Sequence, residues 1–464
     1  MNNLIKHVFR AYDIRGLSPG EIDETFAINL GLSLVKQFGP RKVLVGHDMR
    51  VTSTALERGL IQGLISGGAD VVRIGLCSTP MFNVIVGLGN GEYDFGVMVT
   101  ASHNPGKYNG FKMVRGDAFP IGQGSGMEEL AEAFQNIDEM EFTPSRKGNV
   151  IDDPGALQRY VDHILKLAVL PTDMPKFKIA IDAGNGMAGA ILPELLSRLP
   201  WLEVIPMYFE PDGTFPNHEA NPIKTETLND LRDMVLNENC DLGIAFDGDA
   251  DRIGLMDENG KSVSGDLAIA IIGQEVLRSS PGGLVLYDVR SSWAAPEAIE
   301  QAGGRSKMCP VGHAFIKRQM REEGATFAGE LSMHYYFRDL RYVESGDLVM
   351  LYILRRLARE KARLSELWKP LAKYFHSGEL NFEVDDKEEI IERIKQVYAA
   401  EATQVIDIDG IRMEFRYPDN PEQDWWFNLR TSNTESLIRL NLETRSEKLT
   451  YEKIKELTEL IRRS

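Results

Sequence analysis

Residues 241–252 read Asp-Leu-Gly-Ile-Ala-Phe-Asp-Gly-Asp-Ala-Asp-Arg, an apolar run that ends in three alternating aspartates. A short apolar run bounded by polar residues is typical of a buried strand. Two other runs end in the same way: residues 95–99 lead into Thr100-Ala101-Ser102, and residues 325–329 lead into Glu330. Because ligands of open α/β sheets bind outside the carboxyl ends of the strands, we expect these three motifs to face one cleft.

The pattern of apolar runs repeats three times along the chain and predicts the domain organisation. In each copy, short β-branched runs alternate with longer amphipathic stretches, which is typical of βαβ units with parallel strands. Beyond residue 370 the strand-like runs are neighbours in sequence, which favours a smaller α+β domain. We therefore expect an α/β chain with three tandem mixed-sheet α/β domains of similar topology plus a C-terminal α+β domain around a central cleft. The expected domains are residues 1–150, 151–253, 254–370 and 371–464.

Composition and charge exclude several classes of partner. Of the 464 residues, 43% are hydrophobic and 26% charged, which is an ordinary globular balance. The net charge of −17 argues against nucleic acid or an anionic membrane as partner, because both need a basic face. Cys77, Cys240 and Cys309 are too sparse for a disulfide framework or a zinc site. With no signal-like or membrane-spanning apolar run, we expect a cytoplasmic protein.

Asp247, Asp249 and Asp251 are candidate metal ligands. Spacing by two residues in an extended chain places the three carboxylates on one side. Their charges repel and raise one another's pKa unless a cation neutralises them, and such oxygen ligands favour Mg²⁺ or Ca²⁺. The alternative is an acidic surface turn, but delivery by an apolar strand favours metal. An EF-hand is excluded, because Arg252 stands where that loop needs glycine.

Two further loops carry candidate functional residues. Ser102 is a candidate nucleophile, with His103 beside it and Lys112 near in sequence. Residues 430–435, Arg-Thr-Ser-Asn-Thr-Glu, could bind a phosphate through the Arg430 guanidinium, hydroxyls and backbone donors. Taken alone, each stretch is equally well explained as a polar turn that ends a strand.

A third loop supports a different class of protein. Residues 184–189, Gly-Asn-Gly-Met-Ala-Gly, match the GxGxxG fingerprint, follow a strand-like run and open a helix, and Glu210 lies about twenty residues on. This match favours an NAD-dependent dehydrogenase. It leaves the aspartates, the Ser102 loop and the Arg430 loop unexplained, and glycines are also expected wherever a helix packs closely on a strand.

Taken together, the motifs resemble the α-D-phosphohexomutase superfamily, and in particular its bacterial phosphomannomutase/phosphoglucomutase branch. The matching pieces, which run through nearly the whole chain, are Ala11–Gly16, Thr100–Pro105, Tyr108–Lys112, Asp212–His218, Phe246–Arg252, Gly312-His313, Gly329–His334 and Arg430–Glu435. The resemblance implies four domains around a central cleft, as the repeat does.

The resemblance also implies roles for individual residues. Ser102 would carry the transferred phosphate, and Asp247, Asp249 and Asp251 would hold Mg²⁺ with that phosphate as a further ligand. The residues expected around the phosphoryl group are Arg15, His103, Lys112 and Arg252. Those expected at the sugar are Glu330 and Ser332, with His334 as a proton carrier. The residues expected to grip the second phosphate are Arg430, Ser432, Asn433 and Thr434, and Tyr12, Arg290 and His313 are expected near the substrate.

The implied reaction interconverts hexose 6-phosphate and hexose 1-phosphate through a hexose 1,6-bisphosphate, which is also the expected activator. Mannose is the expected sugar, with glucose as a second; a phosphoglucomutase, a phosphoglucosamine mutase, a phosphatase and a sugar-phosphate-binding protein are the alternatives. The expected partners are small hexose phosphates, and the expected state is a monomer or small homo-oligomer. Three positions depart from the family pattern: Met333 replaces a common Gly, Arg290 a common Lys and Ser436 a common Pro. Met333 leaves the sugar preference open.

Overall fold

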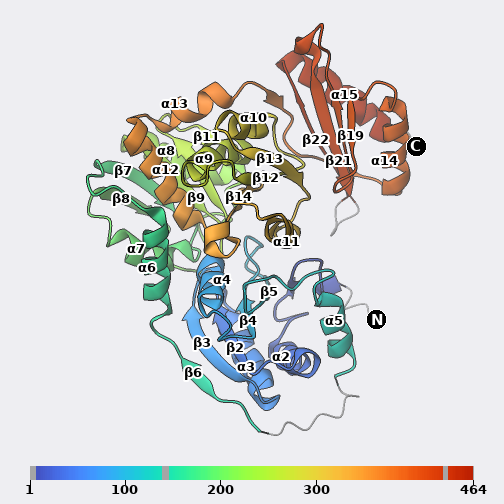
Figure 1. The fold of residues 1–464 in the computed structure, drawn as a ribbon. Coiled ribbons are helices and arrows are strands. Elements are labelled where there is room, and N and C mark those ends of the chain that lie inside the picture. Colours follow the sequence, from blue (N-terminus) through green and yellow to red (C-terminus); the bar gives the residue numbers. More distant parts are fainter. Residues whose placement is uncertain (1–6, 138–145, 432–436, 463–464) are drawn as a thin grey trace.

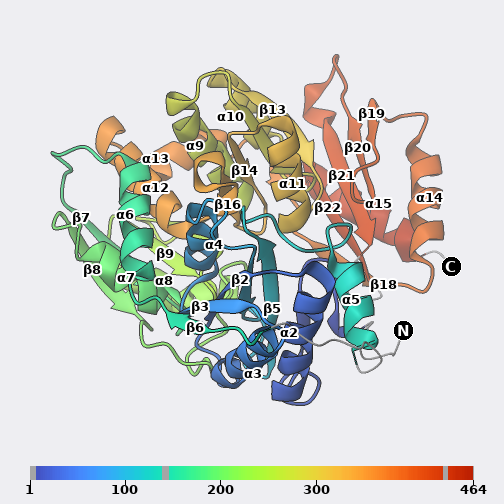
Figure 2. The same ribbon diagram turned by 60° about the horizontal axis from the view of Figure 1, so that its bottom comes forward.

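Four β-sheets follow one another along the chain in the computed structural model (Figure 1). The structure describes residues 7–137, 146–431 and 437–462. Three sheets lie close together and the fourth stands to one side, joined to the third (Figures 1 and 2). None of the helices in these ranges is long and apolar enough to span a membrane.

The first sheet has six strands in the order β1-β5-β4-β2-β3-β6. β2 pairs in parallel with β3 and β4, and β5 then adds to β4 in the antiparallel direction. The strands are β1 Ile14–Leu17, β2 Lys42–His47, β3 Asp70–Leu76, β4 Phe95–Val99, β5 Tyr108–Arg115 and β6 Val150–Asp152. The helices are α2 Glu24–Phe38, α3 Ser53–Ser66, α4 Thr79–Leu88 and α5 Met127–Gln135.

The second and third sheets repeat this arrangement with five strands each, in the orders β11-β10-β9-β7-β8 and β13-β12-β14-β15-β16. Each has three parallel strands with the first in the middle, followed by an antiparallel strand on the third. The strands are β7 Phe177–Asp182, β8 Leu202–Met207, β9 Leu242–Phe246, β10 Ile253–Asp257, β11 Ser262–Val263, β12 Leu284–Asp288, β13 Arg305–Cys309, β14 Phe327–Gly329, β15 Tyr335–Phe337 and β16 Val343–Glu344. The helices are α6 Ala156–Ala168, α7 Ala188–Leu196, α8 Asn229–Asn237, α9 Gly265–Ser279, α10 Ala294–Gln301, α11 His313–Glu323, α12 Gly346–Glu360 and α13 Leu364–Trp368. Short 3₁₀ turns cover Thr225–Leu228, Arg338–Leu340 and Lys369–Leu371.

The fourth sheet is antiparallel throughout, in the order β17-β22-β21-β20-β19 with β18 also on β22. Its strands are β17 Phe375–His376, β18 Leu380–Glu383, β19 Gln404–Ile406, β20 Ile411–Phe415, β21 Trp425–Thr431 and β22 Leu437–Thr444. Its helices are α14 Lys387–Tyr398 and α15 Glu447–Arg462, with a 3₁₀ turn at Pro421–Gln423. The expected fold class, three similar mixed-sheet α/β domains and a terminal α+β domain, is confirmed. The residue ranges of the domains stay a prediction.

Burial explains why the first three domains hold a fixed arrangement. Every residue of β4, β9 and β12 is buried, as expected for strands covered on both faces. One continuous apolar cluster runs through all three domains and includes the inner faces of α4, α6 and α12. α4 is buried except for Leu88 and packs on α6 and β16. The fourth domain has an apolar core of its own.

Candidate active site

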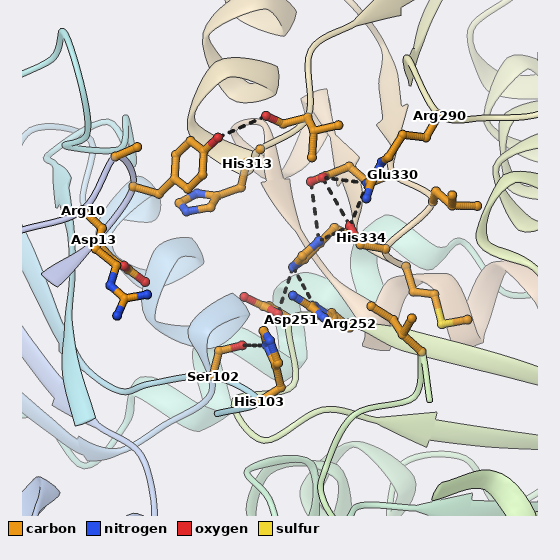
Figure 3. Close-up of a pocket in the computed structure, with 18 of the residues that line it drawn as sticks. Arg10, Asp13, Ser102, His103, Asp251, Arg252, Arg290, His313, Glu330 and His334 are labelled. Carbon is orange, nitrogen blue, oxygen red and sulfur yellow. Dashed lines mark hydrogen bonds and ion pairs between the residues drawn. The ribbon is translucent and has the colours of Figure 1, made fainter. Parts of the chain in front are cut away.

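A cleft of about 1230 Å³ lies between the domains, and every domain contributes to its wall. Figure 3 shows part of this wall, with side chains from the first three domains. Ser102 comes from the first domain, Asp251 from the second, Glu330 from the third and Arg430 from the fourth. Ser102 follows β4, Asp251 belongs to the loop after β9, and Glu330 follows β14. The carboxyl ends of three equivalent strands therefore meet at one cleft, as expected.

Ser102 is held at the junction of the first two domains. Its backbone adopts a left-handed conformation, with a φ of +51°, and its N–H donates to Thr100 Oγ1 at 3.0 Å. The Ser102 hydroxyl donates to Asp247 Oδ2 at 2.9 Å and lies 3.2 Å from His103 Nδ1. A side chain at Gly248 would place its Cβ 2.4 Å from the carbonyl oxygen of Ser102. Only glycine therefore allows the aspartate loop to lie this close to the serine loop.

Arg50 holds the serine loop through hydrogen bonds, although no motif in the sequence indicated this role. This buried guanidinium pairs with Asp48, with Nε 3.2 Å from Oδ2. It donates to four backbone carbonyl oxygens of the loop, those of Ser102 (2.7 Å), Asn104 (2.6 Å), Pro105 (3.0 Å) and Tyr108 (2.9 Å). The signal available in the sequence was the strand end at Asp48, which is equivalent to the ends at Asp182 and Asp288.

The three aspartates form a buried cluster suited to a divalent cation. One carboxylate oxygen from each lies within 4.8 Å of the others. Lys112 Nζ donates to Asp249 Oδ2 at 2.7 Å and to Asp251 Oδ2 at 2.6 Å. The other oxygen of Asp249, Oδ1, is buried without a hydrogen bond, and that of Asp251 faces His334 Nε2 at 3.2 Å. Hard carboxylate oxygens in a tight buried group, one of them unsatisfied, fit Mg²⁺. Thr79 at the start of α4, which no motif in the sequence indicated, also donates to Asp249 Oδ2 at 2.6 Å.

The surroundings shift the pKa values of Asp247 and Asp251 in opposite directions. Burial, and then the charges of Asp251 and Asp249, raise the pKa of Asp247 well above its usual value. Burial acts in the same direction on Asp251, but Lys112 and His334 outweigh it and hold the pKa of Asp251 well below its usual value. Burial disfavours the charge on Lys112, yet Asp249 and Asp251 raise its pKa above that of a free lysine. Three carboxylates thus face two cations, Lys112 and the more distant Arg252, whose Nε lies 4.0 Å from Asp247 Oδ2, and this excess of acidic groups favours a bound cation.

His103 is a neutral neighbour of Ser102. Burial, followed by the charges of Arg252 and Arg15, lowers the pKa of His103 well below its usual value. Arg15 lies across the loop, where its Nη1 donates to Asn104 Oδ1 at 2.9 Å and its other nitrogen pairs with Asp13. The structure therefore gathers the residues predicted around the phosphoryl group.

His334 links the aspartate cluster to the third domain (Figure 3). Its Nε2 lies 3.2 Å from Asp251 Oδ1 and 3.3 Å from Arg252 Nε. Its Nδ1 lies 3.5 Å from Glu330 Oε1 and 3.3 Å from Ser332 Oγ. Glu330 also accepts from Ser332 Oγ at 3.3 Å. Residues predicted from separate motifs therefore form one continuous chain of polar contacts.

The remaining predicted residues line the other walls. Arg290 pairs with Asp288, with Nη2 2.7 Å from Oδ2, and its Nη2 lies 3.8 Å from Glu330 Oε2. The Tyr12 hydroxyl donates to the carbonyl oxygen of Val311 at 3.3 Å, and its ring centroid lies 5.6 Å from that of His313. Burial, followed by Lys317, lowers the pKa of His313 well below its usual value.

The predicted phosphate loop begins at Arg430 at the end of β21. Arg430 belongs to β21, and its side chain lines the cleft. Ser432, Asn433 and Thr434 lie outside the described residues, as does Ser436. Their expected contacts stay a prediction.

The backbone N–H groups of the GxGxxG loop already donate hydrogen bonds within the chain. The N–H groups of Asn185, Gly186 and Met187 donate to the carbonyl oxygens of Tyr208, Ala183 and Gly248, at 2.9, 2.7 and 2.9 Å. A Cβ at Gly189 would lie 2.0 Å from the carbonyl oxygen of Phe209. The glycines thus serve close packing of α7, and these amides are not available to a pyrophosphate.

Known proteins resemble this chain over its whole length. Four family models match in order: phosphoglucomutase/phosphomannomutase alpha/beta/alpha domain I at residues 6–141, domain II at 158–260, domain III at 264–374 and the C-terminal domain at 379–460. The phosphomannomutase of Methanocaldococcus jannaschii is 41% identical over 457 residues, covering 98% of this chain and 97% of that protein. The phosphomannomutase of Escherichia coli K12 is 38% identical, covering 95% of each.

A solved structure agrees with these relatives. The crystal structure of a phosphoglucomutase/phosphomannomutase family protein from Burkholderia thailandensis is 30% identical, covers 99% of this chain and 98% of that one, and superposes with a TM-score of 0.86. The order of the motifs, the four sheets and the relatives lead to one conclusion: this chain belongs to the phosphoglucomutase/phosphomannomutase family of phosphohexomutases.

Proposed function

We propose that this enzyme moves a phosphate between O6 and O1 of mannose, and of glucose as a second substrate, through phospho-Ser102. The observation that supports this best is the hydrogen bond from Ser102 Oγ to Asp247 Oδ2, 2.9 Å long, within a buried group of three carboxylates. A serine that bears a phosphate at this point would lie against a divalent cation held by the three aspartates.

The aspartates and the cations around Ser102 have separate tasks. Asp247, Asp249 and Asp251 would hold Mg²⁺, which neutralises charge on the phosphoryl oxygens and supplies no redox chemistry. Lys112, Arg15 and Arg252 would stabilise the charge that spreads over the phosphoryl oxygens during transfer. Their placement before the reaction is what lowers the barrier, because phosphoryl transfer is mainly a matter of position and charge.

The transfer conserves atoms and protons. A sugar hydroxyl oxygen bonds to the phosphorus of phospho-Ser102 while the bond from phosphorus to Ser102 Oγ breaks. The hydroxyl proton passes to His334, which contacts Asp251 and Glu330. His334 then returns this proton, so that the departing Ser102 Oγ ends protonated and the site neither gains nor loses a proton. The product, a hexose 1,6-bisphosphate, turns around and returns its other phosphate to Ser102 by the reverse step.

The far side of the cleft would hold the sugar and the second phosphate. Glu330 and Ser332 would accept and donate hydrogen bonds to sugar hydroxyls, and Arg430 would pair with the phosphate that does not react. Ser432, Asn433 and Thr434 are proposed to add donors to it. Tyr12, Arg290 and His313 would border the substrate.

The proposal also covers the activator, the cellular compartment and the partners of the enzyme. Hexose 1,6-bisphosphate would activate the enzyme by restoring the phosphate on Ser102. The buried, unpaired cysteines suit a reducing compartment such as the cytoplasm. The acidic chain suits small hexose phosphates rather than nucleic acid or membrane, and a monomer or small homo-oligomer is proposed.

The test is phosphate migration on mannose 1-phosphate and glucose 1-phosphate in parallel, with Mg²⁺ and a trace of hexose 1,6-bisphosphate. We expect hexose 6-phosphate from both, faster from mannose, and loss of turnover when EDTA removes Mg²⁺. Release of inorganic phosphate in place of hexose 6-phosphate would identify a phosphatase instead. Turnover restricted to glucosamine 1-phosphate would identify the enzyme as a phosphoglucosamine mutase instead.

A further inference from the structure

Three arginine side chains from two domains converge on one carboxylate in the wall of the cleft. The Glu379 oxygens lie 3.3 Å from Arg430 Nη2 and 3.2 Å from Arg439 Nη1. The third cation, Arg290, comes from the loop after β12 and places Nη1 3.6 Å from Glu379 Oε2. All four side chains line the cleft. Glu379 thus contacts the arginines that we expect to bind the phosphate of the substrate.

The sheet itself forces two of these charges together. Arg430 on β21 and Arg439 on β22 are directly opposite each other in the antiparallel pair. Side chains at opposite positions project from the same face, and like charges there destabilise the sheet unless an anion neutralises them. Burial raises the pKa of Glu379, but Arg290, Arg430 and Arg439 outweigh it and lower that pKa. The carboxylate is therefore ionised and supplies the neutralising charge.

With Glu379 in this position the cluster is already balanced. Arg290 also pairs with Asp288, and Arg430 Nη1 lies 3.8 Å from Asp409 Oδ2. The three guanidiniums thus face at least three carboxylates. A phosphate dianion that arrived beside this balanced group would meet no uncompensated positive charge, so its binding requires Glu379 to leave.

We propose that Glu379 is an internal substitute for phosphate, which the substrate must displace from the arginines and which sets the affinity for sugar phosphates. This rests on the proposed function of Arg430. The Glu379 side chain is 26% exposed and that of Arg430 only 6%, so the carboxylate can turn into the cleft while the arginine stays in place. Phosphate prevails in the exchange, because it offers more charge and more acceptor oxygens to the guanidiniums than a carboxylate does.

The same exchange serves release. As a phosphate departs, Glu379 returns to the arginines and offsets the cost of uncovering their charges. A bisphosphate that has to turn around between two transfers therefore leaves this site more readily than it would leave three bare guanidiniums. The cost is a lower apparent affinity, reduced by the fraction of molecules in which Glu379 occupies the site.

The test compares Glu379→Gln with Glu383→Gln, a control on the exposed face of β18. Binding of inorganic phosphate to the full chain is measured by calorimetry, and KM and kcat for mannose 1-phosphate by turnover. We expect Glu379→Gln to bind phosphate about tenfold more tightly and to lower KM by a similar factor without raising kcat, because the phosphate that does not react is held equally in the ground state and the transition state. Glu383→Gln should match the unchanged protein.

Equal or weaker phosphate binding by folded Glu379→Gln would overturn the proposal and leave Glu379 with a structural role, since loss of a structural contact does not raise affinity. Glu379→Asp provides a second comparison, because it keeps the charge on a shorter side chain that cannot reach all three arginines. Its phosphate affinity should lie between those of the unchanged protein and Glu379→Gln, and an affinity at or below that of the unchanged protein would contradict the proposal. Failure of the proposed function looks different: the unchanged protein would bind phosphate yet isomerise no hexose phosphate.

Discussion

Ser102 shows how one residue combines a nucleophile with a fixed geometry. Its hydroxyl already points at Asp247, and the left-handed backbone is held by Thr100. We expect Ser102→Ala to lose at least about 10³-fold in mutase turnover, because no other group accepts the phosphate, while the melting temperature stays unchanged. Mannose 1-phosphate turnover and circular dichroism measure the two effects, with Ser306→Ala as a control. Full turnover by Ser102→Ala would remove Ser102 from the mechanism.

Arg50 shows that a residue can matter to the site without facing the substrate. We expect Arg50→Lys to lose about 10²-fold in turnover, because an ammonium cannot hold four carbonyl oxygens and the serine loop shifts. It should also lower the free energy of unfolding by about 3 kcal/mol, since Asp48 loses a well-placed buried partner. Urea unfolding and turnover check both, and Arg58→Lys, at an exposed ion pair, should resemble the unchanged protein. Retained activity would assign loop support to other contacts.

At the scale of elements, α7 decides between two interpretations of the GxGxxG loop. We expect Gly189→Ala to lower the free energy of unfolding by about 1–3 kcal/mol, because the new methyl group would meet the carbonyl oxygen of Phe209. Gly20→Ala, where a Cβ meets no neighbouring atom within 4 Å, is the matched control. NAD should leave the unfolding midpoint unchanged in both. A raised midpoint with NAD, together with an undisturbed Gly189→Ala, would restore the dinucleotide interpretation.

At the scale of the whole molecule, a buried contact between α6 and α12 makes stability depend on pH. Burial raises the pKa of Asp347 from 3.8 to about 6, and the Tyr160 hydroxyl donates to its carboxyl group. Between these values the folded chain keeps a proton that the unfolded chain has lost. The free energy of unfolding therefore falls as pH rises through this window, by up to about 3 kcal/mol from this group, and stays lower above it.

Asp347→Asn should remove this dependence, because an amide does not titrate. The difference in the free energy of unfolding, variant minus unchanged protein, should be larger at pH 7.5 than at pH 4. Urea unfolding at both pH values measures it. Asp339→Asn, at an exposed ion pair, is the control. The same difference from the unchanged protein at both pH values would show that Asp347 does not titrate in this window.

The parts of the fold that could be predicted are those in which local pattern decides. Parallel strands such as β9 and β12 are recognisable as continuous apolar runs, because both of their faces are covered. The antiparallel terminal domain is recognisable because its strands follow one another in the sequence. Less visible were β1 and β6, short edge strands whose place depends on partners far along the chain. The candidate site was predictable where residues are consecutive, as in the aspartate triad. It was not predictable at Arg50 and Thr79, which act through distant backbone and carboxylate groups.

The order of amino acids is enough to predict which side chains are present for phosphoryl chemistry and at which strand ends they stand. Periodicity and spacing carry that information, because they depend on neighbours within a few residues. The contacts of His334 with Asp251 and of Glu379 with three arginines become visible in the folded chain alone. Such contacts join residues from different elements or domains. The first depends on how α4, α6 and α12 pack the first three domains together, and the second on how the fourth domain, which has its own core, lies against the loop after β12. No local pattern specifies either.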